Sequence, residues 1–206
     1  MRNAYKFRIY PNKMQEMQLD LTLEICRHIW NAALADRKNA WEEEGISLSY
    51  EDQAAKLTYE KYQNSGLYCV NAHVLQDVLR RVKKAFDSFF RRVSERATKK
   101  GYPRFRKEGQ YKSFTYPDSG FKLDGSRLTL SKISGSIRVF KHREIEGKIK
   151  TCTLKRDRTG AWFVIFVTEQ DAPLKAEPVS AIGVDLGINH AAVTSDGRYF
   201  DYPKYY

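Results

Sequence analysis

The residues Ala181-Ile-Gly-Val-Asp-Leu-Gly-Ile-Asn-His-Ala-Ala-Val-Thr-Ser-Asp-Gly197 form the most informative stretch of the chain. Their first part predicts a buried strand over residues 179–184 that stops at one acid, Asp185. Gly183 and Gly187 flank the acid and lack a Cβ, so a phosphate or another strand can approach the backbone closely. A carboxylate in this position suits a Mg²⁺ ligand in phosphoryl-transfer chemistry, because hard cations prefer carboxylate oxygens. An isolated Asp-x-Gly is also typical of an aspartate that caps a turn.

The residues after the acid predict a hairpin. A second apolar run covers residues 191–193, and a third covers residues 198–200. Asp196-Gly197 lies between them, and Asp-Gly is a strong hairpin-turn signal between two apolar runs.

The charge of the chain is concentrated in one region. The 206 residues carry a formal net charge of +11, and residues 80–112 alone contain thirteen Lys or Arg against three Asp or Glu. A solvated helix face is the alternative explanation, but such faces usually mix signs, as residues 36–61 do. A band this basic, close to Phe and Tyr, indicates a polyanionic partner, most simply nucleic acid.

The three cysteines are far apart in sequence and contain no CxxC pair. This spacing argues for a reducing compartment and against a zinc site within these residues. The chain shows neither a signal peptide nor an apolar run of membrane length, and we therefore expect no membrane partner.

The first hundred residues predict one strand and three helices. Residues 3–10 alternate, with Tyr5, Phe7 and Ile9 on one face. Asn12 opens a helix whose apolar residues recur from Met14 to Leu34, as far as Gly45. A capping box at residues 49–52 starts a second, shorter helix, and a third, expected to be the longest, runs from about residue 71 to 98. We expect Trp30 and Trp41 to lie in the core.

The remaining residues before the linker have the two-residue period of strands. Candidate strands cover residues 112–116, 120–123, 127–132, 136–140, 148–155 and 161–168. Together with the first strand they predict a small closed antiparallel barrel, which would remove exposed edges. Two prolines and the lack of periodicity predict a linker at residues 173–178.

The long basic helix and the loop after it are the candidate nucleic-acid surface. Its apolar stripe packs on the other helices, and the basic residues lie largely off that stripe. In the loop, Arg104 and Arg106 offer guanidinium forks to phosphates. Phe105 has two interpretations, as a stacking platform for a base or as an anchor of the loop in the core. The candidate RNA- and DNA-binding residues are Arg80, Arg81, Lys83, Lys84, Arg91, Arg92, Lys99, Lys100, Arg104, Phe105 and Arg106.

Three ordered motifs resemble those of one family. Residues 183–188 and the Ala-Val-Thr-Ser-Asp-Gly that follows resemble the first motif of a RuvC-type nuclease domain, as found in TnpB (OrfB) proteins. These proteins accompany bacterial and archaeal insertion sequences and are related to type V CRISPR effectors. The opening residues 5–13 and the later Gly101-Tyr-Pro-Arg-Phe-Arg106 resemble the family's other two signatures in order and spacing.

The resemblance implies an α+β fold with three parts. Residues 1–11 and 100–172 would form an oligonucleotide-fold-like wedge barrel, interrupted by a helical recognition lobe at residues 12–99. Residues 179–206 would begin an RNase H-like RuvC domain with its first hairpin. The second and third catalytic acids, and the family's zinc ribbon, belong to motifs in a further C-terminal nuclease half that these residues do not contain.

The resemblance also implies a function. TnpB-like proteins are RNA-guided DNA endonucleases of the prokaryotic cytoplasm and nucleoid, with guide RNA and double-stranded target DNA as partners. Asp185 matches the first catalytic acid and Mg²⁺ ligand, while Tyr50 and Gln76 match positions that approach the target-adjacent duplex. Gln can bind adenine bidentately in the major groove, although Gln76 can equally be a solvent-facing helix residue. One carboxylate cannot hold two Mg²⁺ ions, so we expect this chain to bind nucleic acid without cutting it.

Two alternatives belong to other functional classes. The chain could be a nuclease-dead or truncated relative that occupies DNA through its guide RNA. Residues 182–187 also resemble the phosphate-binding hairpin of actin-like ATPases and sugar kinases. Those folds place hydroxyl residues after the second glycine, whereas Ile188-Asn189-His190 stand there in this chain.

Overall fold

The computed structural model describes residues 1–170 and 181–203, which belong to two separate units. The first unit is Met1–Gln170, and the second lies within Asp171–Tyr206. The predicted linker at 173–178 and the first residues of the predicted strand at 179–184 lie outside the described residues. Each unit is described by itself.

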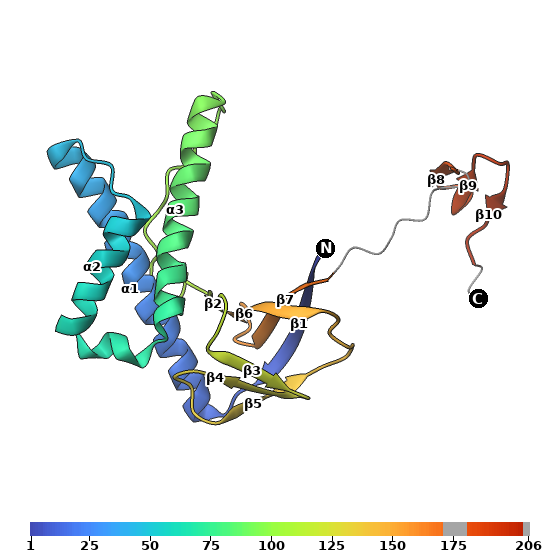
Figure 1. Cartoon of the computed structure of the whole chain (residues 1–206). Coiled ribbons are helices and arrows are strands. Elements are labelled where there is room, and N and C mark those ends of the chain that lie inside the picture. The colour runs from blue at the N-terminus through green and yellow to red at the C-terminus, as the bar shows by residue number, and fades with distance from the viewer. Residues whose placement is uncertain (171–180, 204–206) are drawn as a thin grey trace. The chain divides into compact units, whose positions relative to one another are not determined.

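The first unit contains a seven-stranded antiparallel sheet (Figure 1). The order of its strands is β2-β6-β7-β1-β5-β4-β3. Their bounds are β1 Arg2–Tyr10, β2 Ser113–Tyr116, β3 Phe121–Asp124, β4 Arg127–Leu130, β5 Ser136–Phe140, β6 Lys148–Arg156 and β7 Trp162–Glu169. Strand β1 pairs with β7 on one side and β5 on the other, so the first strand of the chain lies in the middle of the sheet.

The side chains of β1 alternate between the core and solvent, as predicted. Tyr5, Phe7 and Ile9 are each 7% exposed or less, whereas Lys6 and Arg8 face solvent. The buried face joins a hydrophobic core that continues into the helices through residues such as Leu19 and Val78. The predicted strands 112–168 are confirmed to within two residues at each end.

The sheet is curled, but it is not the closed barrel that we expected. Among the described residues, no ladder joins the edge strands β2 and β3. The Tyr116 hydroxyl, at the end of β2, donates a hydrogen bond to the carbonyl of Ser131, just after β4, at 2.8 Å. Strands β2 and β3 have four residues each, and the turn that joins them includes Gly120 (φ 86°).

All three helices lie between β1 and β2 in the chain, as the resemblance implied. Helix α1 spans Lys13–Glu44, α2 spans Tyr50–Gln63 and α3 spans Ala72–Ser94, with a short 3-10 helix η1 at Ser65–Cys69. The predicted capping boxes at Asn12–Gln15 and Ser49–Asp52 are both present. Gly45 ends α1 in the left-handed region (φ 68°), where glycine has no steric cost.

The longest helix is α1, with 32 residues, and not α3, with 23. Helix α3 ends four residues before the predicted position 98. Arg96 adopts a left-handed conformation (φ 51°), and the Ala97 amide donates back to the Arg92 carbonyl at 2.9 Å. This closes the helix in the manner that a C-terminal glycine usually does.

The rotation of α1 also differs from the predicted stripe. Met14 and Met17 are 64% and 73% exposed, and Leu19, Leu23 and Cys26 are buried instead. The cause is polar. Gln15 is 4% exposed and donates from Nε2 to the Ser134 carbonyl at 2.8 Å, which turns this side of the helix toward the loop between β4 and β5.

The two tryptophans of α1 differ in burial. Trp30 is buried, as predicted, but Trp41 is 64% exposed. No described residue of α1 beyond Leu34 is buried, and Trp41 lines an open cavity with residues of α3 and of the loop after it. The prediction that Trp41 lies in the core is therefore wrong.

The second unit is a three-stranded hairpin sheet in the order β10-β9-β8. Its strands are β8 Val184–Asp185, β9 Ala192–Thr194 and β10 Tyr199–Phe200. The Asp196-Gly197 turn forms as predicted, with the Gly197 amide donating to the Thr194 carbonyl at 2.9 Å. The predicted buried strand is wrong for the described residues, since Val184 is 59% exposed and no described element of this unit covers it.

Candidate nucleic-acid interface

Helix α3 has one apolar and one basic face. Val74, Leu75, Val78, Leu79, Val82 and Phe86 are buried and hold the helix against α1, α2 and β2. Arg80, Lys83, Lys84 and Arg91 are exposed. Lys83 pairs with Asp87 one turn later at 2.7 Å, an exposed pair that leaves the lysine accessible. The predicted separation of core face and basic face is thus present.

Arg81 does not lie on that basic face. It is part-buried and binds the sheet, with Nη1 donating to the Ser113 carbonyl at 2.7 Å and Nη2 to the Thr115 hydroxyl at 2.6 Å. Its Nε donates to Asp77 at 2.7 Å. Every nitrogen of this guanidinium therefore has a partner within the protein, and its role in the structure is to fix α3 to β2.

The loop after α3 is anchored by Tyr102 and Pro103. Pro103 is buried, and the Tyr102 ring meets Phe86 and Phe89 edge-on at centroid distances of 5.6 and 5.2 Å. Phe105 is 52% exposed. Of the two interpretations of Phe105, the structure favours the accessible ring, because other residues anchor the loop.

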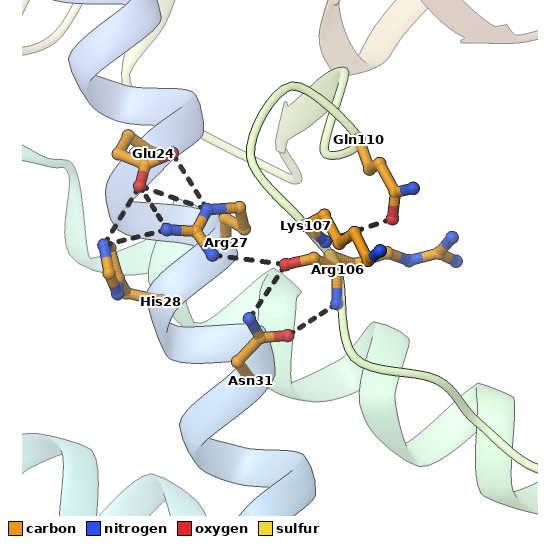
Figure 2. A network of polar contacts seen from close by, with 7 residues as sticks. All are labelled: Glu24, Arg27, His28, Asn31, Arg106, Lys107 and Gln110. Carbon is orange, nitrogen blue, oxygen red and sulfur yellow. Dashed lines mark hydrogen bonds and ion pairs between the residues drawn. The ribbon is translucent and has the colours of Figure 1, made fainter.

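Helix α1 then holds the backbone of residues 104–106 from the other side. Asn31 faces this backbone and binds Arg106 twice (Figure 2), accepting from its amide at 2.8 Å and donating to its carbonyl at 2.9 Å. Trp30 Nε1 donates to the Arg104 carbonyl at 3.1 Å. These hydrogen bonds use only the loop's main chain, and the side chains of Arg104, Phe105 and Arg106 are exposed, with the Arg106 guanidinium 5.5 Å from the Trp30 ring.

A second layer of polar contacts orients the loop. Arg27 donates from Nη1 to the Arg106 carbonyl at 3.2 Å and is itself held by Glu24, which also contacts His28 (Figure 2). The hydrogen bond from Arg27 lowers the pKa of Glu24, and the charge of Arg27 and the contact with His28 add to this effect. Glu24 therefore stays ionised and keeps Arg27 in place.

Arg92 has a comparable structural task. Its Nε donates to the Lys100 carbonyl at 2.6 Å and its Nη2 to the Gly101 carbonyl at 3.1 Å. These bonds fold the chain after α3 back along the helix. The exposed Lys99 and Lys100 are thereby held close to the end of α3 and to Arg91.

The two residues predicted to approach the target-adjacent duplex lie on one seam between α2 and α3. Tyr50 is the first residue of α2, and its ring lies 5.8 Å from the Arg80 guanidinium. Gln76, one turn before Arg80, is half-buried and lines a cavity of about 280 Å³ with Leu57 and Tyr62. Gln76 is therefore not a fully solvent-facing residue.

Asp185 stands alone in its unit. It is exposed, ends the two-residue strand β8 and pairs with Val193. The preceding Gly183 is bound to Ser195 through both its amide and its carbonyl, at 2.9 and 2.8 Å. Within residues 1–170 and 181–203, no group of three or more His, Cys, Asp or Glu side chains could hold a metal ion. Asp185 can supply one ligand, and the described residues do not complete its site.

Sequence reasoning missed two features. The residues that hold the loop, Asn31 above all, gave no signal, because an Asn on a helix face has no motif of its own. The outer face of the sheet also carries basic and aromatic side chains. Arg8 pairs with Phe140 (55% exposed), and Tyr10 (48% exposed) pairs with Arg138. The alternation in residues 3–10 contained that signal.

Comparison with known proteins adds to this geometry. The profile of a family described as a helix-turn-helix domain, of the OrfB IS605 type, matches residues 1–45. A protein of Streptomyces pristinaespiralis that carries the name of an RNA-guided DNA endonuclease is 31% identical over 210 aligned positions, covering 100% of this chain and 51% of that protein. InsQ of Escherichia coli K12, with the same kind of name, is 30% identical over 96% of this chain and 48% of its own length.

The resemblance to the TnpB (OrfB) family is confirmed. The chain spans about half the length of the curated TnpB-like relatives it matches. Within residues 1–45, the chain forms β1 and one uninterrupted helix, and its turn to the next helix begins only at Gly45. No helix of the described residues is long and apolar enough to cross a membrane.

Two solved structures were also found to be similar. A Cas12f1 in complex with sgRNA and target DNA covers 98% of this chain and 57% of its own, with 11% identity and a TM-score of 0.45. A CRISPR-Cas12f ternary complex covers 90% of this chain and 48% of its own, with 10% identity and a TM-score of 0.42.

Proposed function

We propose that this chain is the nucleic-acid-binding portion of an RNA-guided DNA endonuclease associated with an insertion-sequence transposon. One observation carries the proposal. The basic face of α3 and the loop 99–107 form an accessible basic and aromatic surface, and α1 holds the main chain of residues 104–106 through three hydrogen bonds. A rigid surface of this kind binds a phosphate backbone without first being ordered. Such a protein acts where prokaryotic DNA lies, in the cytoplasm and nucleoid.

The parts of the chain would divide the work. Residues 1–11 and 100–172 would act as an oligonucleotide-fold-like wedge, and residues 12–99 as the recognition lobe. Residues 179–206 would begin the RuvC nuclease domain. Exposed Arg8, Tyr10 and Phe140 on the outer face of the sheet support a nucleic-acid role for the wedge.

The predicted binding residues then fall into two groups. Most have exposed side chains and would contact nucleic acid directly; these are Arg80, Lys83, Lys84, Arg91, Lys99, Lys100, Arg104, Phe105 and Arg106. Arg81 and Arg92 would act by holding α3 and the loop in place. Tyr50 and Gln76, on the seam between α2 and α3, would face the target-adjacent duplex.

Asp185 would be the first ligand of a Mg²⁺ site. The metal, when bound in a complete site, would stabilise charge on the phosphate under attack. One exposed carboxylate does not make a two-metal centre. The purified chain of 206 residues would therefore bind guide RNA and target DNA without cutting, which is how a nuclease-dead relative would also behave.

The test of binding is the salt dependence of RNA affinity. The double variant Arg104→Gln/Arg106→Gln should reduce the slope of log affinity against log salt by about one to two, since each phosphate contact contributes roughly 0.7–0.9. The matched control Lys13→Gln/Lys132→Gln removes the same charge from two exposed sites outside the loop. Equal slopes for the two double variants would refute the assignment of this surface.

The test of cleavage uses the same chain with Mg²⁺, RNA and a matched DNA duplex. We expect a complex without strand scission. Guide-dependent cutting that disappears in Asp185→Ala would contradict this part of the proposal, because it would require a complete metal site within the chain.

A further inference from the structure

An apolar cavity of about 700 Å³ lies at the far end of the helical lobe, away from the sheet. Its walls come from the end of α1, the turn after it, the end of α3 and the returning loop. They include Trp41, Ile46, Phe86, Phe89, Phe90 and Tyr102. The core contacts described above do not account for this cavity.

Several of these aromatic rings are presented to solvent. Trp41 is 64% exposed, Phe90 56% and Tyr102 45%. Phe89 packs against Phe90 and Tyr102 at centroid distances of 5.2 Å each, which fixes the orientation of both exposed rings. Exposed rings that are held in place offer π-faces for stacking at little cost in conformational entropy.

A guanidinium with unused donors also lines the cavity. Arg37 is fixed by Gln53, which accepts from Nε at 2.7 Å and itself donates to the Ala33 carbonyl at 2.8 Å. The guanidinium lies 5.1 Å from the Phe86 ring. Its Nη2 is buried without a hydrogen-bond partner among the described residues. Nη1 also makes no hydrogen bond among the described residues, but unlike Nη2 it is not closed off from solvent, so it is the donor that a ligand in the cavity could use.

The mouth of the cavity is continuous with the basic surface. Phe89-Phe90 is followed directly by Arg91-Arg92, and Tyr102 is preceded by Lys99-Lys100-Gly101. The bonds from Arg92 to the carbonyls of residues 100 and 101 bring these two basic pairs together beside the aromatic walls. Glu42 also lines the cavity and pairs with Lys38 at 3.8 Å.

We propose that this cavity binds one unstacked nucleobase of a strand whose backbone runs along the basic residues at its mouth. The rings of Trp41 and Phe90 would stack on the base, and Nη1 of Arg37 would donate to an acceptor on its edge. The proposal rests on the proposed nucleic-acid function and adds to it a site that reads a base, beside a surface that reads phosphates.

The test separates bases from backbone. A single-stranded RNA oligonucleotide is compared with the same strand carrying an abasic nucleotide at each position in turn. We expect one abasic position to weaken binding roughly tenfold, the effect typical of losing one stacked base. The same scan with single-stranded DNA reports whether the site requires a ribose.

Two exposed positions give variants that should fold. Trp41→Ala and Phe90→Ala should each weaken the intact strand about tenfold and the abasic strand hardly at all. Tyr59→Ala, which removes another exposed aromatic (65%) from α2 outside the cavity, is the matched control and should change neither. Trp41 is also the exposed tryptophan of the three, since Trp30 and Trp162 are buried, so base stacking should quench fluorescence that Trp41→Phe abolishes.

Three outcomes would overturn the proposal. Equal binding of intact and abasic strands, with retained salt dependence, would remove the base site but leave the proposed function standing. Absence of any RNA binding would refute both. Concentration-dependent self-association that Trp41→Ala abolishes, without any base dependence, would show that a second copy of the chain occupies the cavity.

Discussion

Replacing Asn31 by Ala should loosen the loop 104–106 without touching any residue of the proposed nucleic-acid surface, leaving only the bonds from Trp30 and Arg27 to hold its main chain to α1. The two hydrogen bonds between the Asn31 amide and the Arg106 main chain measure 2.8 and 2.9 Å. A net value of about 0.5–1.5 kcal/mol for each bond gives a loss of roughly 1–3 kcal/mol in the free energy of unfolding. For a domain of this size, that corresponds to a fall in Tm of about 2–12 °C.

The same substitution should weaken RNA binding by about three- to tenfold. A loosened loop must be ordered again when Arg104, Phe105 and Arg106 bind the RNA. The entropy lost in this ordering makes the binding free energy less favourable. The salt slope should change little, because the charged groups are all still present. Fluorescence anisotropy with a labelled RNA at several salt concentrations measures both quantities.

The chain offers a matched control in Gln18. Its side chain also makes two hydrogen bonds to a loop, with the Ser134 hydroxyl and the Ser134 amide, both at 2.9 Å. Gln18→Ala should therefore lower the Tm by a similar amount, yet leave RNA binding unchanged. Equal binding by Asn31→Ala and the unaltered chain, or equal weakening by both variants, would refute the role of Asn31 in presenting the loop.

Three further predictions concern structural roles. Arg81→Ala should lower the free energy of unfolding by about 2–4 kcal/mol, because it leaves half-buried Asp77 without its partner. The control Lys84→Ala, at an exposed position of the same helix, should change this free energy, measured by urea unfolding, by no more than about 0.5 kcal/mol. Asp185→Asn should leave the Tm unchanged without metal, since the side chain is exposed, and a fall of several degrees would mean that Asp185 is structural. Cys69 should react with a thiol reagent at pH 8 in the native state, while Cys26 and Cys152 should react only on unfolding. The reason is burial, which raises the pKa of Cys26 to about 12 and also raises that of Cys152. Rapid reaction of all three thiols would contradict the packing.

Local sequence patterns determined the secondary structure. The two-residue alternation of residues 3–10 indicates a strand with one buried face, and it does so without information on what covers that face. Strand β1 and its inward residues were therefore predictable. The capping residues Asn12 and Ser49 act on amides within three positions, so the starts of α1 and α2 were predictable as well. The same holds for the core face of α3, where the apolar stripe at helical spacing is unbroken from Val74 to Phe86.

The tertiary structure decided what each basic or aromatic side chain does. Arg80 and Arg81 are neighbours of one type in the sequence, but only the second reaches Ser113 and Thr115, which lie more than thirty residues away along the chain. Trp30 and Trp41 lie on one helix, but Trp30 packs against Tyr111 in the core, whereas Trp41 lines an open cavity. Long-range contacts of this kind depend on how the helices meet the sheet, and no local pattern records them.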